Sequence, residues 1–185
     1  MRTPSHFLMT AALNTTIPAE RRHTMAFLIG SVLPDIPFTL LTLIYSAVYP
    51  LYGMIPDNVS VMEYLHFELF FTDPIWIISH NFFHSLIIGG GLVLLGYLKR
   101  DTRFGFALMW LSIGTLFHTL IDIVTHHSDG PLFLFPLNWT YRFASPISYW
   151  ESNYFGNQIR IFEYLLDSVL LLYLIYNWWQ KRRLN

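Results

Sequence analysis

The stretch FGFALMWLSIGTLFHTLIDIVTH, residues 104–126, decides the fold of this chain. Its larger part, Phe104–Ile121, contains no Asp, Glu, Lys or Arg. A helix needs about 20 mainly apolar residues to cross the hydrocarbon core of a bilayer. The stretch therefore predicts a membrane-spanning helix that carries two ionisable side chains, His118 and Asp122, toward one end.

Three further segments have the same apolar character. Charged residues are absent from Ile36–Pro56 and Pro74–Leu98, and Ile159–Trp179 is charged only near its start. We therefore expect an all-α, polytopic membrane protein with about four transmembrane helices, forming one domain over residues 1–185. The expected spans lie near Met25–Tyr49, Trp76–Leu98, Phe104–His126 and Ile159–Trp179.

The first expected span contains a helix-breaking motif, Leu33-Pro34-Asp35-Ile36-Pro37. Two prolines this close break or sharply kink a helix. Before the motif, Ser5–Thr15 and Glu20–Leu33 are predicted to form a short helical hairpin, with its turn around Ile17-Pro18-Ala19. A hairpin returns its far ends to one place, so we expect His6 to lie near Asp35.

The composition narrows the classes of function. The chain has 185 residues, of which 54% are hydrophobic and 12% charged, whereas a soluble domain is about 25% charged. Its net charge of -1 gives no reason to expect a nucleic-acid partner, because phosphate binding needs a basic surface. The chain has no Cys, so any metal ion must be held by imidazole and carboxylate groups.

The basic residues predict the orientation in the membrane. One group, Arg2, Arg21 and Arg22, precedes the first span. A second group, Lys99, Arg100 and Arg103, lies in the connection after the second span. A third group, Lys181, Arg182 and Arg183, follows the last span. The positive-inside rule places both chain ends in the cytoplasm. The longer connections, Pro50–Ile75 and His127–Gln158, are then outside. The first of them holds only acidic charges, at Asp57, Glu63, Glu68 and Asp73.

Ionisable side chains within the expected spans are the candidates for function, because they are costly in a bilayer and usually face the protein interior. His80 and His84 are four residues apart, as are His118 and Asp122, and His126 extends the second series. Side chains at this spacing share one helix face. Because the two spans run antiparallel, His84 and His118 lie at matched depths of ~12 Å, and His80 and Asp122 at ~6 Å.

Other polar residues could reach the same level of the membrane. The hairpin geometry places Asp35 ~10 Å below the outer surface of the ~30 Å core. Glu163 and Asp167 of the last span fall at similar depths. They would either orient the ligand imidazoles from behind or lie at the membrane interface.

The order of these motifs resembles the membrane-bound metal-dependent hydrolases, a family also catalogued as LexA-binding inner-membrane hydrolases. The resemblance covers about residues 5–150. It rests on His6, Leu33-Pro34-Asp35-Ile36, His80-Asn81-Phe82-Phe83-His84-Ser85, the stretch HTLIDIVTHHSDG at 118–130, and Phe135-Pro136-Leu137. It implies a prokaryotic inner-membrane protein with a divalent metal site. The helical His/Asp arrangement is also similar, more weakly, to that of zinc-dependent phospholipases C.

We therefore expect one or two divalent metal ions, with Zn²⁺ the first choice and Mn²⁺ or Fe²⁺ possible. The candidate ligands are His6, Asp35, His80, His84, His118, Asp122 and His126. Asp122 or Asp129 would serve as general base. Arg142 would either grip a lipid phosphate or anchor its loop to headgroups.

The predicted function is hydrolysis of a phosphoester or related ester of a lipid-like substrate in the membrane. Two other classes stay open. The first is a metal-ion or proton transporter, for which so few spans would require a homo-oligomer. The second is a non-catalytic membrane protein whose metal ion only staples helices together; a closed coordination shell would favour it.

Overall fold

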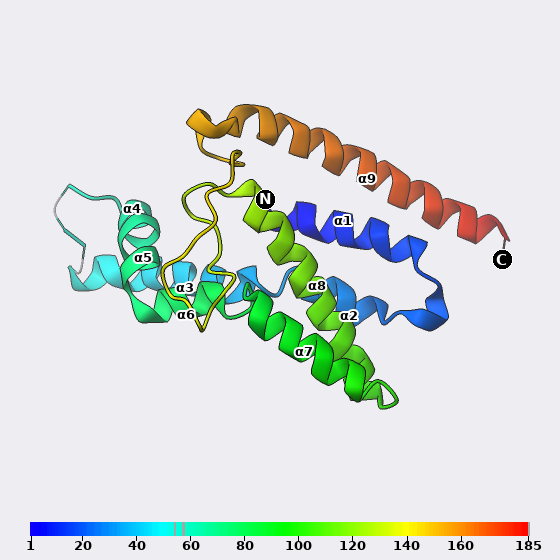
Figure 1. Ribbon diagram of the computed structural model, residues 1–185. Coiled ribbons are helices and arrows are strands. Elements are labelled where there is room, and N and C mark those ends of the chain that lie inside the picture. The colour runs from blue at the N-terminus through cyan, green and yellow to red at the C-terminus, as the bar shows by residue number, and fades with distance from the viewer. Residues whose placement is uncertain (54, 57, 185) are drawn as a thin grey trace.

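A computed structural model describes residues 1–53, 55–56 and 58–184 of the chain. All the regular structure in these ranges is helical, which confirms the all-α prediction (Figure 1). Asp57, counted above among the outer acidic residues, lies outside the described residues. The main helices are α1 (Thr3–Thr16), α2 (Thr24–Gly30), α3 (Asp35–Val48), α6 (Pro74–Asn81), α7 (Leu86–Leu98), α8 (Arg103–Thr125) and α9 (Gly156–Leu184). The short helices are η1 (Ala19–Arg21), η2 (Tyr49–Tyr52), α4 (Val61–Glu63), η3 (Tyr64–Leu69, a π-helix), α5 (Phe70–Thr72) and η4 (Ser152–Tyr154).

Helix α8 is the central element, and α2 and α7 pack along it (Figure 1). Glycines allow the close approach: a Cβ at Gly114 would collide with the Phe27 carbonyl, and one at Gly30 with the Leu111 carbonyl. Small residues at such contacts are typical of helix packing in membranes. The backbones of α2 and α8 therefore touch directly, which fixes the end of α2 against the middle of α8.

The proline motif breaks the first span as expected. Helix α2 ends at Gly30, α3 begins at Asp35, and the two are bent by 49°. Pro34 and Pro37 have no N–H, so neither can continue the hydrogen-bond ladder of a single helix. The predicted hairpin is present before the break, because α1 and α2 contact each other across η1. Its second helix is shorter than the expected Glu20–Leu33, since η1 is separate and α2 covers only Thr24–Gly30.

The second span is also broken, which corrects the expectation of one helix over Trp76–Leu98. Helix α6 ends at Asn81, α7 begins at Leu86, and the bend is 45°. Ser85 starts the new helix, since its Oγ accepts hydrogen bonds from the backbone N–H groups of Ile87 (3.1 Å) and Ile88 (3.0 Å). The Leu86 N–H is turned out of the helix to the Phe133 carbonyl, at 2.9 Å. A serine cap and a partner from a distant loop thus stabilise a break without proline.

Among the described residues, helix α8 alone is long and apolar enough to cross a membrane, and the count rises to three if each bent pair is one span. The fourth expected span, Ile159–Trp179, is not confirmed in the part of the chain that the structure describes. The reason lies in the sequence, because Asp167 and Lys181 leave only thirteen uncharged residues between them. That length is short of the ~20 residues that a span requires.

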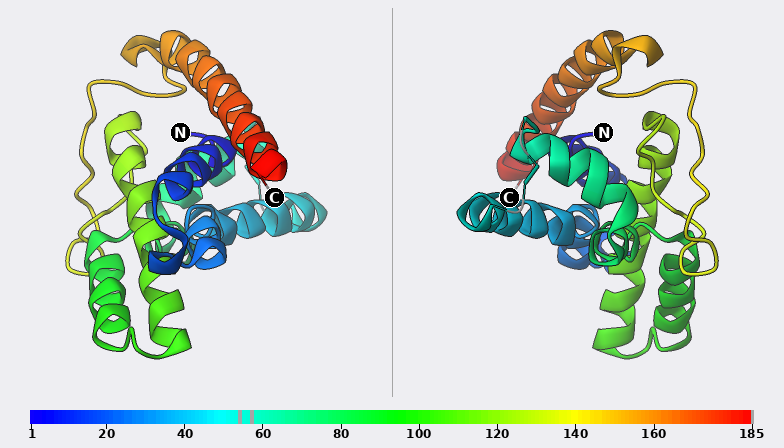
Figure 2. Two further views of the ribbon diagram at one scale, coloured as in Figure 1. Left: turned by 90° about the vertical axis from the view of Figure 1, so that its right-hand side faces the viewer. Right: turned by 90° about the vertical axis from the view of Figure 1, so that its left-hand side faces the viewer.

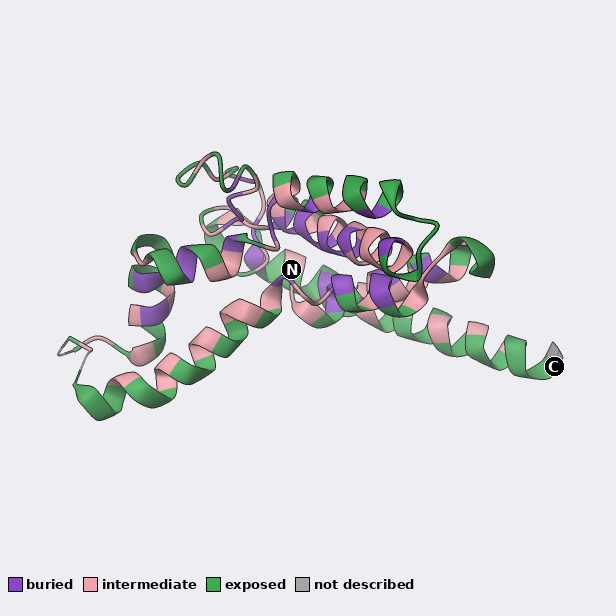
Figure 3. Ribbon diagram, turned by 90° about the horizontal axis from the view of Figure 1, so that it is seen from below, coloured by how far each residue is buried: buried purple, intermediate pink, exposed green. Residues whose placement is uncertain are grey.

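Helix α9 packs mainly on α1, and α7 lies on the opposite side of the molecule, with α1, α2 and α8 between them (Figures 1 and 2). Most of α9 is exposed, and the buried positions gather in the centre of the molecule (Figure 3). The segment 126–155 packs against α6 and α8. Its Leu132 and Phe135 are buried against Ile77, so this loop is part of the packed structure.

Candidate metal site

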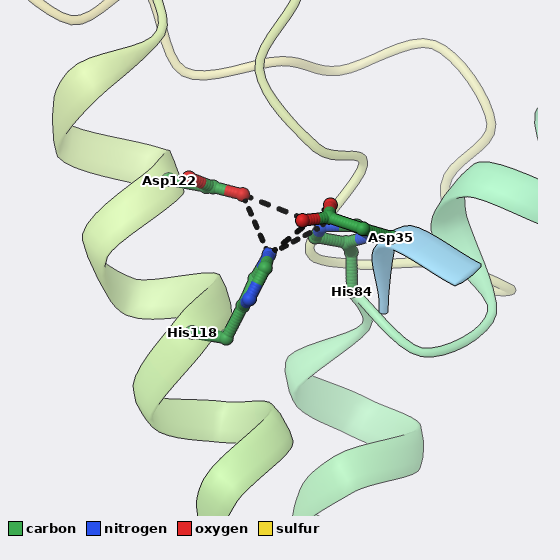
Figure 4. A group of neighbouring side chains, drawn as sticks. All are labelled: Asp35, His84, His118 and Asp122. Carbon is green, nitrogen blue, oxygen red and sulfur yellow. Dashed lines mark hydrogen bonds and ion pairs between the residues drawn. The ribbon is translucent and has the colours of Figure 1, made fainter. Parts of the chain in front are cut away.

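Four side chains from α8 and from the two bent helix pairs converge beside this loop. They are Asp35, His84, His118 and Asp122, and each offers one ligand atom within 4.8 Å of the others. Figure 4 shows His118 and Asp122 projecting from one helix, with Asp35 and His84 approaching from the other side. Asp35 is the first residue of α3, and His84 lies between α6 and α7. Each broken span thus contributes one side chain from its break, and α8 contributes two.

Five of the six distances among the four ligand atoms are close to those around a tetrahedrally coordinated ion, and the sixth, between Asp35 and Asp122, is within 4.8 Å. His84 Nε2 lies 3.2 Å from His118 Nε2, 3.4 Å from Asp122 Oδ2 and 3.7 Å from Asp35 Oδ1. His118 Nε2 lies 3.0 Å from Asp122 Oδ2 and 3.4 Å from Asp35 Oδ1. Ligands held at about 2.0–2.1 Å from a tetrahedral Zn²⁺ are about 3.3–3.4 Å apart. The observed distances scatter around that value.

The second nitrogen of each imidazole shows which atom is free to bind. His118 Nδ1 lies 2.7 Å from the Ser31 carbonyl, and His84 Nδ1 lies 2.5 Å from the His80 carbonyl. A carbonyl only accepts, so both Nδ1 atoms donate and both Nε2 atoms point into the cluster. Metal-ligating histidines almost always have such a partner on the second nitrogen.

The two carbonyls are available because the spans are broken. Ser31 follows the end of α2, and the Asp35 N–H turns to the Val32 carbonyl (3.3 Å) in place of that of Ser31. His80 lies in the last turn of α6. In a continuous helix its carbonyl would accept from the N–H of residue 84, but residue 84 lies beyond the helix end. Irregular backbone at membrane depth is tolerated where its polar groups are satisfied inside the protein. Here the histidine ligands satisfy them.

The cluster requires positive charge at its centre. Two carboxylates and two ring nitrogens face one another, while His84 and His118 are fully buried and Asp122 nearly so. Acids buried together without compensation are strongly destabilising. The Met1 ammonium, 2.8 Å from Asp122 Oδ1, supplies part of this charge. Protons on the imidazoles would supply more, and a divalent cation would supply it at the spacing that the ligand atoms have. The residues present therefore fit a bound metal ion.

His6 is a neighbour of the cluster. Its Nε2 lies 2.9 Å from Asp122 Oδ1, the carboxylate oxygen turned away from the other three residues, and its ring stacks on His118 at 3.7 Å. The Met1 nitrogen lies 2.8 Å from the same oxygen. His6 therefore orients Asp122 and covers His118. The hairpin also reaches Asp35, because Thr3 Oγ1 donates a hydrogen bond to its second carboxylate oxygen.

Glu163 and Asp167 hold helix α1 and do not touch the imidazoles of the four-residue cluster. Glu163 is fully buried and accepts hydrogen bonds from the Arg2 N–H (2.8 Å) and from Ser5 Oγ (2.7 Å). The Arg2 guanidinium lies 3.3 Å from Glu163 and 3.4 Å from Asp167. Helix α9 thereby fixes the start of α1 and, through it, the position of His6.

His80 and His126, both expected as ligands, lie beside the cluster. His80 stacks on His84 at 4.5 Å, and its two ring nitrogens are buried without a hydrogen-bond partner among the described residues. His126 Nδ1 donates to the Asp122 carbonyl at 3.0 Å. Because α6 ends at Asn81, His84 does not follow His80 by one regular helical turn. The His80 ring packs against the His84 ring, and His80 is not a member of the four-residue group.

Asp129 and Arg142, expected in catalysis and substrate binding, lie farther out. Asp129 Oδ2 accepts a hydrogen bond from Trp150 Nε1 at 3.0 Å, while its Oδ1 is buried without a partner in the described ranges. The Arg142 guanidinium donates to the Gly130 carbonyl and lies 4.9 Å and 5.2 Å from the ring centres of Phe70 and Phe71. Burial lowers the pKa of Arg142 to about 10, with the Asp129 carboxylate opposing the shift. It remains charged at neutral pH and joins the loop to α5.

A cavity of about 1140 Å³ opens beside the cluster. Asp35 and Asp122 form part of its wall, together with His80, His126 and Asp129. The Asp35 side chain is 24% exposed, the most of the four cluster residues. The candidate metal site can therefore be reached from this cavity, chiefly past Asp35.

The sequence analysis missed three residues that shape the site: Thr3, Ser31 and Tyr149. Thr3 and Ser31 act through contacts to Asp35 and His118, and only the proline motif signals that the Ser31 carbonyl is free. Tyr149 lines the cavity 4.7 Å from the His126 ring. Burial raises the pKa of Tyr149, and nearby carboxylates, first Asp129, raise it further, so its hydroxyl stays protonated.

Comparison with known proteins supports the membrane assignment. The family described as YdjM inner membrane protein matches residues 1–184 of this chain. No curated protein and no solved structure matches it. The family description agrees with the expected inner-membrane class and names no activity. Since the match covers almost the entire sequence, the chain belongs to the YdjM inner membrane protein family.

Proposed function

We propose that this protein is a membrane-embedded, metal-dependent hydrolase that cleaves a phosphoester, or a related ester, of a lipid-like substrate. The observation that supports it most is the His₂Asp₂ cluster at tetrahedral spacing, open to a large cavity. When bound, a divalent ion would supply Lewis acidity, polarising a phosphoryl oxygen and lowering the pKa of water.

The ligand set favours zinc. It contains only imidazole and carboxylate groups, which suit Zn²⁺ and, less specifically, Mn²⁺ or Fe²⁺. Within the described residues only this one group has three or more such side chains close enough to share an ion. We therefore propose one ion per chain, held by Asp35, His84, His118 and Asp122.

The residues around the cluster have distinct roles in this proposal. His6 keeps Asp122 oriented through the 2.9 Å contact to Oδ1. Asp129 would accept a proton from the attacking water, because its unpartnered Oδ1 belongs to the same cavity wall. Tyr149, which stays protonated, would donate a hydrogen bond to the substrate.

The membrane setting favours a lipid-like substrate. The cluster lies at breaks within membrane segments, where water-soluble substrates would have poor access. The distribution of basic residues would turn the cavity mouth toward the outer face of the inner membrane. A lipid ester could reach the cluster from the surrounding bilayer without leaving it.

The test begins with elemental analysis of purified protein. Wild type should carry about one zinc, manganese or iron ion per chain, and the His84→Ala/His118→Ala variant should carry none, because half of the coordinating shell is removed. The matched control is His23→Ala/His127→Ala, two histidines outside the cluster, which should keep the metal. Hydrolysis of phosphoester lipids in vesicles should be lost with the metal.

Absence of metal from wild type after incubation with divalent ions would remove the basis of this proposal. Full hydrolytic activity in a correctly inserted His84→Ala/His118→Ala variant would equally contradict the mechanism. In either case His84 and His118 would serve helix packing alone.

A structural metal site is the second candidate, and the four-residue shell favours it. Structural zinc has four protein ligands, whereas catalytic zinc usually has three and an open position. The partial exposure of Asp35 to the cavity favours an open, catalytic site over a closed, structural one. With Co²⁺ in place of the native ion, methylphosphonate should alter the visible spectrum of an open site and leave that of a closed one unchanged.

A further inference from the structure

The cavity beside the metal cluster has two chemically different parts. One end carries the polar residues Asp35, Asp122, His80 and His126. The remaining wall is mainly apolar and aromatic, although Glu63 and His66 also line it; its principal members are Phe38, Met62, Phe67, Phe70, Phe71 and Trp150. Its volume of about 1140 Å³ is at or above the upper end of the 300–1,000 Å³ typical of small-molecule sites. A compact polar substrate would leave most of this wall uncovered.

The apolar wall comes from α3 on one side and from the short helices α4, η3 and α5 on the other, here called the arm (residues 61–72). The arm is anchored by Leu65 and Leu69, which are buried together with Trp76. Phe38 of α3 packs edge-on against Phe70 and Trp76, each at 5.5 Å. The aromatic wall is therefore a fixed surface that is already formed beside the cluster.

The outer lip of the cavity is apolar and exposed. Met62, Phe67 and Phe71 of the arm are 53%, 58% and 40% exposed, and Trp150 is 40% exposed opposite Phe67, with ring centres 6.2 Å apart. Exposed apolar side chains at the mouth of a cavity mark a surface that meets lipid or ligand. In an inner membrane protein, such a lip lets an alkyl chain pass from the bilayer without crossing water.

The charges at the polar end indicate an anionic head group. Arg2 lines the cavity, but Glu163 and Asp167 already pair with it. Asp35 and Asp122 repel anions until a metal ion neutralises them. The Met1 ammonium also lines the cavity, but it pairs with Asp122 at 2.8 Å. Among the described residues of the cavity wall, both cations are therefore paired, and the ion would supply the charge that binds an anionic head group. The aromatic wall begins beside the cluster with His80, whose ring lies 5.4 Å from Phe38 and 4.8 Å from Phe70.

We propose that this cavity binds a single long-chain amphiphile, with its phosphate head at the metal cluster and its alkyl chain along the wall of α3 and the arm. The chain enters sideways from the bilayer between the arm and Trp150. This inference rests on the proposed function for the head group, and it adds where the chain binds and which residues select it. Phe38 and Thr39 of α3 are the specificity residues.

The test uses hexadecylphosphonate with a photoreactive diazirine near the end of its chain, a probe that cannot be hydrolysed. Metal-loaded protein in lipid nanodiscs is irradiated, and the labelled peptides are mapped. Labels should concentrate on residues 62–71 and 149–150. Unlabelled hexadecylphosphonate should displace them, and methylphosphonate, which has no chain, should not.

Two neighbouring residues of α3 provide a matched pair of variants. Thr39→Trp places an indole in the cavity, where it would take space that the alkyl chain needs, and should lower labelling of the arm about tenfold. Leu40→Trp lies outside the cavity lining and is 53% exposed, so labelling should stay within about twofold. Both positions are exposed, so neither change disturbs the packed core.

The outcomes separate this inference from the proposed function. Labels spread over α9 and the outward side of α3, unchanged in Thr39→Trp, would overturn the inference and leave the metal result standing. Labels confined to the cavity but unaffected by metal removal would support the chain site and overturn the placement of the head on the ion. Loss of cavity labelling on metal removal would support both parts.

Discussion

Helix α8 and the two broken spans supply the same cluster by opposite means. Helix α8 is continuous over Arg103–Thr125. His118 and Asp122 are four residues apart, so the regular helix brings them to one face. The other two spans contribute Asp35 and His84 at their breaks, and each break also provides a carbonyl that orients a histidine. A regular helix places side chains by spacing alone, whereas a break places one side chain and frees one backbone acceptor.

The first prediction concerns the break before Asp35, which the following variant would straighten. In Pro34→Ala/Pro37→Ala, the Asp35 N–H would turn back to the Ser31 carbonyl, which would then no longer orient His118. Loss of such a partner typically costs 10–100-fold in metal affinity. We expect a fall of that size in zinc affinity, measured by competition with a chelating dye.

Pro50→Ala is the control, because Pro50 lies in η2, away from the cluster. Unchanged zinc affinity in the double variant would mean that the break does not orient His118.

The second prediction concerns the contact between α2 and α8, which lies apart from the metal-ligating side chains of α8. Gly114→Val would force α2 away from α8, because even a Cβ at this position meets the Phe27 carbonyl. We expect a loss of about 1–3 kcal/mol of stability, the usual cost of overpacking, seen as a lower unfolding temperature in detergent. Zinc affinity should fall as well, because Ser31 moves with α2.

Gly90→Val is the matched control, since a Cβ at Gly90 meets no atom within 4 Å. Equal unfolding temperatures for the two variants would contradict direct backbone contact between α2 and α8.

The smallest expected effect tests the break between His80 and His84. His80→Phe keeps a flat ring against His84, Phe38 and Phe70 but removes both nitrogens. If His80 is not a ligand, zinc content should stay near one ion per chain and affinity within about threefold. A loss as large as that of His84→Ala would show that His80 coordinates the ion.

The sequence predicts the helical class and the convergence of the cluster, and the physical reasons differ by residue. His118 and Asp122 could be paired because α8 is regular. Asp35 could be placed because the hairpin and the proline motif are local signals. The 45° bend after Asn81 could not be foreseen, since it depends on Ser85 as a cap and on a partner from residue 133.

Two carboxylates of helix α9 show why the remaining contacts could not be predicted from the sequence. Glu163 and Asp167 were expected to orient the ligand imidazoles or to lie at the membrane interface, and in the structure they hold α1. The depth of a residue in the membrane, counted along the sequence, does not say which neighbour its carboxylate faces.

The unequal exposure of the four cluster residues has a kinetic consequence. His84, His118 and Asp122 are closed off by protein, and Asp35 is the most exposed member. An ion must therefore arrive and leave through the same cavity that would hold the alkyl chain. Metal exchange would be slow while an amphiphile is bound and fast when the cavity is empty, so the residence time of the ion would report on the lipid composition of the membrane.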